Sequence, residues 1–255
     1  MLLVLDMGNT NITLGVYDGD RLVMQARLAT DRKKLADQYA VELMMLLRLH
    51  GVDGTAFTGA ILSSVVPPLN RVLTAAVKKV TGITPMSVGP GTKTGINIRI
   101  DNPATLGADL LVGAVAAVER VGYPCLIWDL GTATTVSVVD KNGAYIGVAI
   151  MPGVRTSLNS LTEGTSLLPS ISLDAPAKAI GTNTIASLQS GVVYGTAAMI
   201  DGMSARFFEE LGYTAPIVMT GGIAADILPQ CHSDILYVDE LLLDGLRLIY
   251  EKNRK

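Results

Sequence analysis

Two stretches of this sequence place an aspartate near the end of an apolar strand and follow it with a glycine-containing turn. The first runs from Val4 to Val16 and turns at Asp6-Met7-Gly8-Asn9-Thr10. Gly8 lets the backbone approach an anion, Asn9 tolerates a left-handed turn geometry, and successive N–H groups in such a turn form a concave anion site. A carboxylate beside a phosphate is repelled unless a cation lies between them, so Asp6 indicates Mg²⁺, held directly or through water. An ordinary hairpin in which Asp6 caps its own turn is the alternative.

The same pattern recurs in the second half of the chain. Leu126 to Val139 again joins an apolar strand to a β-rich strand, here through Asp129-Leu130-Gly131-Thr132. Two copies indicate a duplicated domain. Two such turns facing each other would bind the phosphates of one nucleotide from both sides.

Asp109 is the one acid on a stretch otherwise composed of Gly, Ala, Leu and Val as far as Glu119, in a helix that we expect over residues 105–121. Desolvation would raise the pKa of its carboxyl and suit it to take a proton from a substrate hydroxyl. The alternative is a first-turn aspartate that favours the helix dipole.

Thr220-Gly221-Gly222 follows an expected strand over residues 215–219 and precedes a helix. Two glycines there would let the backbone lie against a flat adenine ring. A plain strand-to-helix turn explains them almost as well.

Composition limits the classes of function. The chain has 255 residues, of which 49% are hydrophobic and 5% aromatic, and a net charge of −3. This charge gives no case for a nucleic-acid partner, and the run Arg32-Lys33-Lys34 is interpreted as a solvated loop. We expect no signal peptide, no membrane span and no zinc site at Cys125 or Cys231, which together suggest a cytoplasmic protein.

Periodicity predicts two similar halves. Each opens with three meandering strands, and helices are expected over residues 31–50, 69–80, 105–121, 182–211 and 239–253. We expect a first domain over residues 1–118 and a second over 119–255. Small residues at Gly191, Gly195, Ala198 and Gly202 suggest a packing seam between subunits or domains.

Taken in order, these motifs resemble those of type III pantothenate kinase, and the resemblance covers essentially the whole chain. The motifs that carry it are the two aspartate turns, Ser63-Ser64-Val65-Val66-Pro67, Asp101-Asn102-Pro103, Gly107-Ala108-Asp109 and Thr220-Gly221-Gly222. The resemblance implies an α/β fold of two duplicated ribonuclease-H-like domains, as in the actin-like ATPases, with the active site in the cleft between them. It also implies ATP-dependent phosphorylation of pantothenate to 4′-phosphopantothenate, the first step towards coenzyme A.

The resemblance also implies roles for single residues. ATP would be bound by Asp6, Met7, Gly8, Asn9, Thr10, Asn11, Ile12, Thr13 and Thr132, beside the proposed adenine contacts at Gly221 and Gly222. Pantothenate would be bound by Gly107, Ala108, Asp109 and Leu110, and by Thr184 from the partner subunit of a homodimer. Asp109 would be the proton acceptor, and Asp129 would lie by a monovalent cation, K⁺ or NH₄⁺, with Asp6 serving Mg²⁺.

Two positions depart from the family's usual pattern, which has Tyr at Ile100 and Arg at Leu110. Both departures remove polar groups near the substrate, which would allow a shifted substrate preference. Alternative functions are another small-molecule kinase or phosphatase of the same fold, and a non-catalytic regulator that would tolerate Asp109→Asn. A chaperone or filament role fits least, because no length remains for the insertions it needs.

Overall fold

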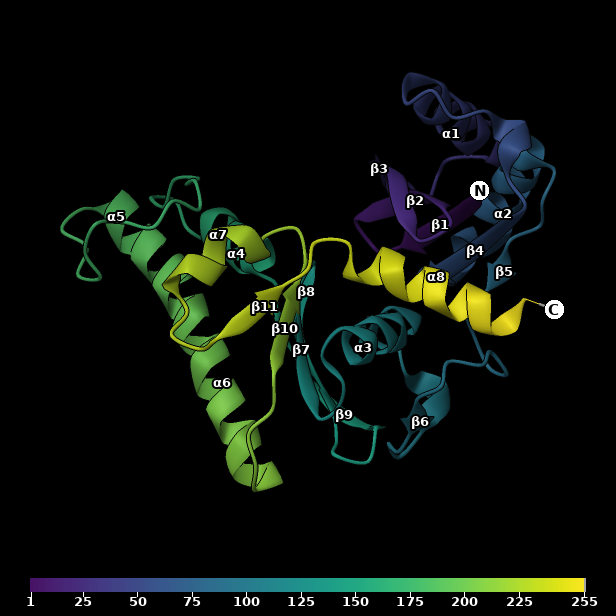
Figure 1. Cartoon of the computed structure of the whole chain (residues 1–255). Helices are drawn as coiled ribbons and strands as arrows, with labels where there is room; N and C mark the ends of the chain where they lie inside the picture. The colour runs from purple at the N-terminus through teal and green to yellow at the C-terminus, as the bar shows by residue number, and fades with distance from the viewer. Residues whose placement is uncertain (255) are drawn as a thin grey trace. The chain divides into compact units, whose positions relative to one another are not determined.

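The structure is a computed structural model that describes residues 1–254. The chain forms two compact units, each with its own sheet (Figure 1). The first comprises Met1–Ile96, Asp101–Ala116 and the chain from Glu240 onward, and the second comprises Asn97–Ile100 and Ala117–Asp239. The chain last enters the second unit after Ala116, and the boundary that we expected follows residue 118. The C-terminal helix, which we expected in the second domain, packs with the first unit.

The first unit contains a five-stranded sheet in the order β3-β2-β1-β4-β5, with helices on both faces. Its strands are β1 (Leu2–Met7), β2 (Asn11–Asp18), β3 (Arg21–Ala29), β4 (Gly59–Ser64) and β5 (Met86–Ser87). Its helices are α1 (Ala36–Leu49), α2 (Asn70–Thr81), α8 (Leu241–Asn253) and the first part of α3 (Ala108–Val121). The β1–β2 and β2–β3 pairs are antiparallel, and β4 runs parallel to β1.

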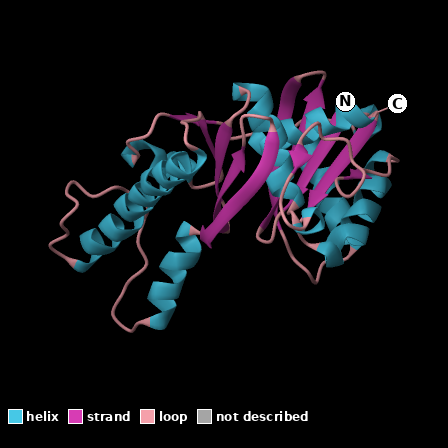
Figure 2. Cartoon of the chain, turned by 90° about the horizontal axis from the view of Figure 1, so that it is seen from below, coloured by secondary structure: helices cyan, strands magenta, loops and turns pink. Residues whose placement is uncertain are grey.

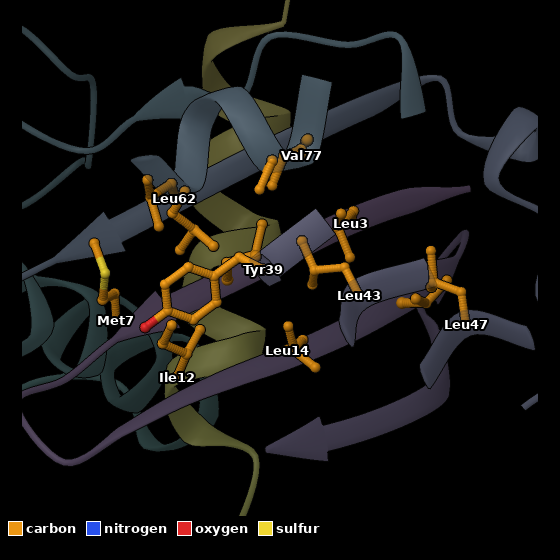
Figure 3. Close-up of a cluster of buried hydrophobic side chains, with 14 of the residues drawn as sticks. Leu3, Met7, Ile12, Leu14, Tyr39, Leu43, Leu47, Leu62 and Val77 are labelled. Carbon is orange, nitrogen blue, oxygen red and sulfur yellow. The ribbon is translucent and has the colours of Figure 1, made fainter. Parts of the chain in front are cut away.

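Residue alternation along β1 explains why both faces of this sheet are covered. Figure 3 shows Leu3 and Met7 packed with Tyr39, Leu43 and Leu47 of α1 in one buried cluster. On the other face, Val4 and its neighbours contact α3 and α8 through a second cluster. That cluster comprises Val4, Tyr17, Ile61, Val112, Val115, Leu243, Leu246 and Ile249.

The second unit contains a six-stranded sheet in the order β11-β10-β7-β8-β9-β6. Its strands are β6 (Asn97–Ile98), β7 (Cys125–Leu130), β8 (Ala133–Val139), β9 (Ala144–Pro152), β10 (Ile217–Thr220) and β11 (Ile235–Tyr237). Its helices are α4 (Val154–Gly164), α5 (Thr184–Gln189), α6 (Gly195–Leu211) and α7 (Ala224–Ile227), drawn in cyan against the magenta strands in Figure 2. A π-helical turn, Ser190–Tyr194, joins α5 to α6.

The two units repeat one arrangement. Strands β1-β2-β3 form an antiparallel meander beside the parallel strand β4, and β7-β8-β9 form the same meander beside the parallel strand β10. The predicted fold class, α/β with two ribonuclease-H-like units, is therefore confirmed. No helix within residues 1–254 is long and apolar enough to cross a bilayer.

Candidate functional site

The β1–β2 turn is tight and does not use the left-handed geometry expected at Asn9. Gly8 N donates to Asn11 O (3.0 Å), which closes the turn. No non-glycine residue of the described chain has a positive φ, and Gly8 is not among the glycines that do. The expectation for Asn9 was therefore wrong, because the hydrogen bond from Gly8 closes the turn with ordinary backbone angles. A β-carbon at Gly8 would lie 3.2 Å from Asn11 O, which is closer than most β-carbon contacts, so the tight turn favours glycine at this position.

Asp6 lies at the centre of a row of polar side chains that crosses the first sheet. It is in register with Thr13 on β2 and with Ser63 on β4, and side chains in register point to the same face. Asp6 is 8% exposed and Ser63 is fully buried, and Ser63 Oγ has no hydrogen-bond partner within the described chain. A buried hydroxyl without a partner is costly, so Ser63 is available to a ligand or water near Asp6.

The second sheet carries the same row. Asp129 is in register with Thr135 on β8 and with Thr220 on β10, at the ends of the strands that correspond to β2 and β4. Thr220 is 3% exposed and its Oγ1 donates to Asp239 O (3.4 Å). Each unit therefore presents a carboxylate between two hydroxyls, next to its glycine-containing turn. Sequence reasoning missed Ser63, Thr135 and Thr220 as row members, because pairing between distant strands is not encoded in local spacing.

The start of α4 contacts the β7–β8 turn. Gly131 N donates to Ala133 O (3.1 Å), and Thr156 Oγ1 donates to Thr132 O (2.9 Å). A β-carbon at Gly153 would lie 2.2 Å from Thr132 O, so only glycine lets α4 begin this close to the turn. The arrangement leaves Thr132 exposed at the turn.

Gly221 is required by packing at the end of β10. It has φ +108°, and a β-carbon there would lie 2.5 to 2.7 Å from three backbone atoms of Leu130. This contact supports the plain strand-to-helix explanation of Gly221 and brings the β10–α7 turn against the end of β7. The adenine contact remains a prediction for Gly221 and for Gly222, which is exposed.

Asp109 lies in the first turn of α3, half-buried, three residues before the core residue Val112. Its Oδ1 accepts a hydrogen bond from Leu110 N (2.8 Å). Burial raises the pKa of the Asp109 carboxyl, and backbone hydrogen bonds oppose part of this rise. A β-carbon at Gly107 would lie 2.4 Å from Asp109 Oδ1, so alanine at this position would displace the carboxylate. The raised pKa is the one expected for a proton acceptor.

The remaining positions that we expect near the substrate lie on three different segments. Leu110 is half-buried beside Asp109, and Ile100 is half-buried after strand β6 in the second unit. Thr184 begins α5 after the cap residue Asn183, whose side chain accepts from Ala186 N. Figure 1 shows α5 removed from strands β7 and β8. Thr184 there lines a cavity of about 550 Å³ together with Leu168, Gly181, Thr182, Asn183, Ser187 and Leu188.

The oxygen donors fit Mg²⁺, which takes one or two carboxylates and completes its shell with water and substrate phosphates. Asp6 supplies such a carboxylate at a strand end, beside the partnerless hydroxyl of Ser63. Residues 1–254 contain no group of three or more His, Cys, Asp or Glu side chains that could hold a metal by themselves. Within residues 1–254, protein side chains alone therefore do not form a complete metal site.

The sequence of the whole chain is similar to those of known kinases. The sequence profile of the family described as type III pantothenate kinase matches residues 2–206. The type III pantothenate kinase of Moorella thermoacetica is 42% identical over 99% of this chain and 100% of its own length.

Two solved structures resemble the chain at low sequence identity, which shows the fold alone. The alignment with a Baf family protein from Campylobacter jejuni covers 98% of both chains, with a TM-score of 0.61 and 18% identity. The inorganic polyphosphate/ATP-glucomannokinase from Arthrobacter sp. strain KM covers 99% of both chains with a TM-score of 0.50 and 15% identity.

Proposed function

We propose that this chain, which belongs to the type III pantothenate kinase family, transfers the γ-phosphoryl group of ATP to the hydroxyl of pantothenate that yields 4′-phosphopantothenate. This reaction is the first step of coenzyme A biosynthesis. The observation that carries the proposal is the row of polar side chains that both units repeat, in which a carboxylate lies between two hydroxyls beside a glycine-containing turn. The chain that carries these rows is similar to such kinases over its full length.

The proposed nucleotide contacts follow from the two turns. Residues 6–13 form the first phosphate-binding segment, and Thr132 contacts phosphate from the β7–β8 turn. The exposure of Thr132, Asn9 and Thr10 supports this assignment, because an anion can approach both turns from solvent. Gly221 and Gly222 are the proposed adenine contacts.

Phosphoryl transfer demands positioning and charge neutralisation more than covalent chemistry, because the transition state spreads charge over the γ-phosphoryl oxygens. Mg²⁺ supplies positive charge to the phosphates when it is bound, and Asp6 is the residue proposed to hold it through water. Asp129 is proposed to lie by the monovalent cation, K⁺ or NH₄⁺.

Asp109 is the proposed proton acceptor. Its carboxylate orients the pantothenate hydroxyl and takes its proton as the new bond to the γ-phosphorus forms and the bond to the leaving ADP breaks. The raised pKa supports this role, since a base of higher pKa holds a transferred proton more strongly. Gly107, Ala108 and Leu110 are the proposed neighbours of pantothenate on the same helix start.

A homodimer in which Thr184 reaches the substrate of the partner subunit is part of the proposal, as is a cytoplasmic location. Gly191, Gly195 and Gly202 support the dimer, because a β-carbon at any of them would meet no described atom within 4 Å apart from its own stretch of helix. Small residues on an open helix face allow another helix to approach closely.

Acceptor specificity is tested by product analysis. Purified protein is incubated with ATP, Mg²⁺ and K⁺ and one acceptor at a time: pantothenate, glucose, N-acetylmannosamine, acetate or glycerol. Mass spectrometry should detect 4′-phosphopantothenate as the main product. Faster phosphorylation of any other acceptor would refute the assignment to pantothenate while leaving a kinase.

The departures at Ile100 and Leu110 give a second test of the same site. Restoring arginine with Leu110→Arg should lower the KM for pantothenate, whose carboxylate a guanidinium binds well. The KM for ATP should not change. A rise in the KM for pantothenate would show that the surroundings of residue 110 accommodate leucine better than arginine.

A further inference from the structure

The loop that follows β3 is attached to the first phosphate-binding turn. Thr30 N donates to Thr10 O (2.9 Å) and Thr30 Oγ1 donates to Gly8 O (2.8 Å). Two hydrogen bonds from one residue thus fix the start of the loop on both sides of Asn9. The loop, defined here as residues 30–34, contains the basic run that the sequence had suggested to be merely solvated.

The loop is also attached to the core. The Tyr39 side chain is fully buried, and Figure 3 shows it in the cluster with Met7 and Ile12. Its hydroxyl donates to Asp31 O (3.0 Å) and accepts from Asp31 N (2.9 Å). Asp31 Oδ1 in turn accepts from Lys33 N (2.9 Å), so the backbone on both sides of Arg32 is held.

Arg32 lies at the point of the loop that meets the turn. Its Nη2 donates to Asn9 Oδ1 (3.3 Å), and the guanidinium has no other hydrogen bond or ion pair within residues 1–254. An arginine side chain carries five N–H donors, so most of them are left for a ligand. Both Arg32 and Asn9 are exposed, so an anion on the turn can reach the guanidinium.

The two neighbouring lysines are placed differently. Lys34 Nζ lies 2.6 Å from Glu42 Oε1 and 5.4 Å from the centre of the Tyr39 ring, so its charge is already neutralised. Lys33 is exposed, and no contact joins its side chain to the described residues of the turn. Of the three basic residues, Arg32 is therefore the one directed at the turn.

We propose that Arg32 binds the terminal phosphates of ATP on the β1–β2 turn. The inference rests on the proposed function, in which residues 6–13 bind these phosphates. Residues 7–13 carry no charged side chain and Asp6 carries a negative one, so the amides and Mg²⁺ are otherwise the sources of positive potential on this side. Arginine pairs with phosphate through two parallel hydrogen bonds, and the anchored loop holds it in place before the ligand arrives.

Binding measurements on the full chain test this assignment. Isothermal titration calorimetry with Mg²⁺ compares ATP and AMP for wild type, Arg32→Ala, Arg32→Lys and Lys33→Ala. Lys33→Ala is the matched control, because it removes the same charge one residue away. AMP is the matched ligand, because it lacks the terminal phosphates.

Arg32→Ala should weaken ATP binding by about 10- to 100-fold, the range for hydrogen bonds to a charged group, and should leave AMP binding within about twofold. Arg32→Lys should recover part of the loss, because the charge remains and the paired hydrogen bonds do not. Lys33→Ala should change ATP binding by less than about threefold, as expected for one exposed, screened charge. Circular dichroism should show unchanged folding of Arg32→Ala, since the wild-type side chain makes one exposed hydrogen bond.

The outcomes separate this inference from the proposed function. Equal losses for Arg32→Ala and Lys33→Ala, or an equal loss of ATP and AMP binding, would overturn the assignment of Arg32, even if wild type phosphorylates pantothenate. A selective loss of ATP binding in Arg32→Ala would support it, even if pantothenate proves not to be the acceptor.

Discussion

Gly107 controls the position of the proposed base, and Gly107→Ala tests this directly. The new β-carbon would lie 2.4 Å from Asp109 Oδ1, whereas ordinary contacts begin near 3.4 Å, so the carboxylate must move by about 1 Å. Gly107 does not have a positive φ, and its obstacle is the end of a flexible side chain, so the helix itself can accept alanine. We therefore expect a folded protein with a misplaced carboxylate.

A misplacement of about 1 Å in a reacting group costs on the order of 10²-fold in rate. This corresponds to about 2.7 kcal/mol of lost transition-state stabilisation. The assay is kcat/KM for pantothenate in a coupled ADP-release assay, with the free energy of unfolding measured by urea titration. Gly107→Ala should lower kcat/KM by about 10²-fold while unfolding changes by less than about 1 kcal/mol.

Gly113→Ala is the matched control in the same helix. Its β-carbon would lie 3.3 Å from Leu242 Cδ2, the mobile end of a side chain, and alanine is the better helix former. It should keep wild-type kcat/KM within about twofold, in keeping with a change that touches no reacting group. Equal kcat/KM values for both variants would refute the account of the Asp109 position.

Four further predictions rest on burial and close contacts. Burial raises the pKa of Asp109, and the base must be ionised to accept a proton. As the pH is lowered, kcat should therefore begin to fall at a higher pH than it would if the base were an aspartate with an ordinary pKa. A pH–rate profile measures this. A raised folded-state pKa also means that the ionised carboxylate opposes folding, so Asp109→Asn should unfold at higher urea than wild type near pH 7, and the difference should vanish in acid. Ser63→Ala should leave the free energy of unfolding unchanged or raise it by about 1 kcal/mol, because the buried hydroxyl has no hydrogen-bond partner among the described residues. The same substitution should weaken the binding of Mg-ATP. A clear loss of stability in urea titration would contradict this prediction. Gly221→Ala should lower the free energy of unfolding by about 2 to 6 kcal/mol, because the backbone is strained at φ +108° and the new β-carbon overlaps with Leu130. A loss of less than about 1 kcal/mol would show that the turn can move away from Leu130.

The turns and the three-strand openings could be predicted because their signals are local. An apolar run, an aspartate and a glycine within a few residues identify each turn, and Asn142-Gly143 identifies the hairpin between β8 and β9. The amphipathic pattern likewise located α8, which begins at Leu241 and ends at Asn253 as the sequence indicated to within a few residues.

The features that the sequence did not reveal depend on pairing between distant segments. Ser63 and Thr220 join the aspartate rows only because β4 and β10 pair in parallel with β1 and β7. Helix α8 packs with the first unit because its apolar face covers the β1 and β4 side of that sheet, which no local pattern specifies. The expected helix at residue 31 begins at Ala36 instead, because Asp31 is held by the Tyr39 hydroxyl, and this is how Arg32 comes to the turn.

The most direct test of the central claim compares product formation by wild type, Asp109→Asn and Asp37→Asn. Asp37 and Asp109 both lie in the first turn of a helix, so the pair separates a general effect on the helix dipole from chemistry at Asp109. With ATP, Mg²⁺, K⁺ and pantothenate, wild type and Asp37→Asn should form 4′-phosphopantothenate at similar rates. Asp109→Asn should be slower by about 10² to 10⁴. Equal rates for Asp109→Asn and wild type, or no 4′-phosphopantothenate from wild type, would contradict the account.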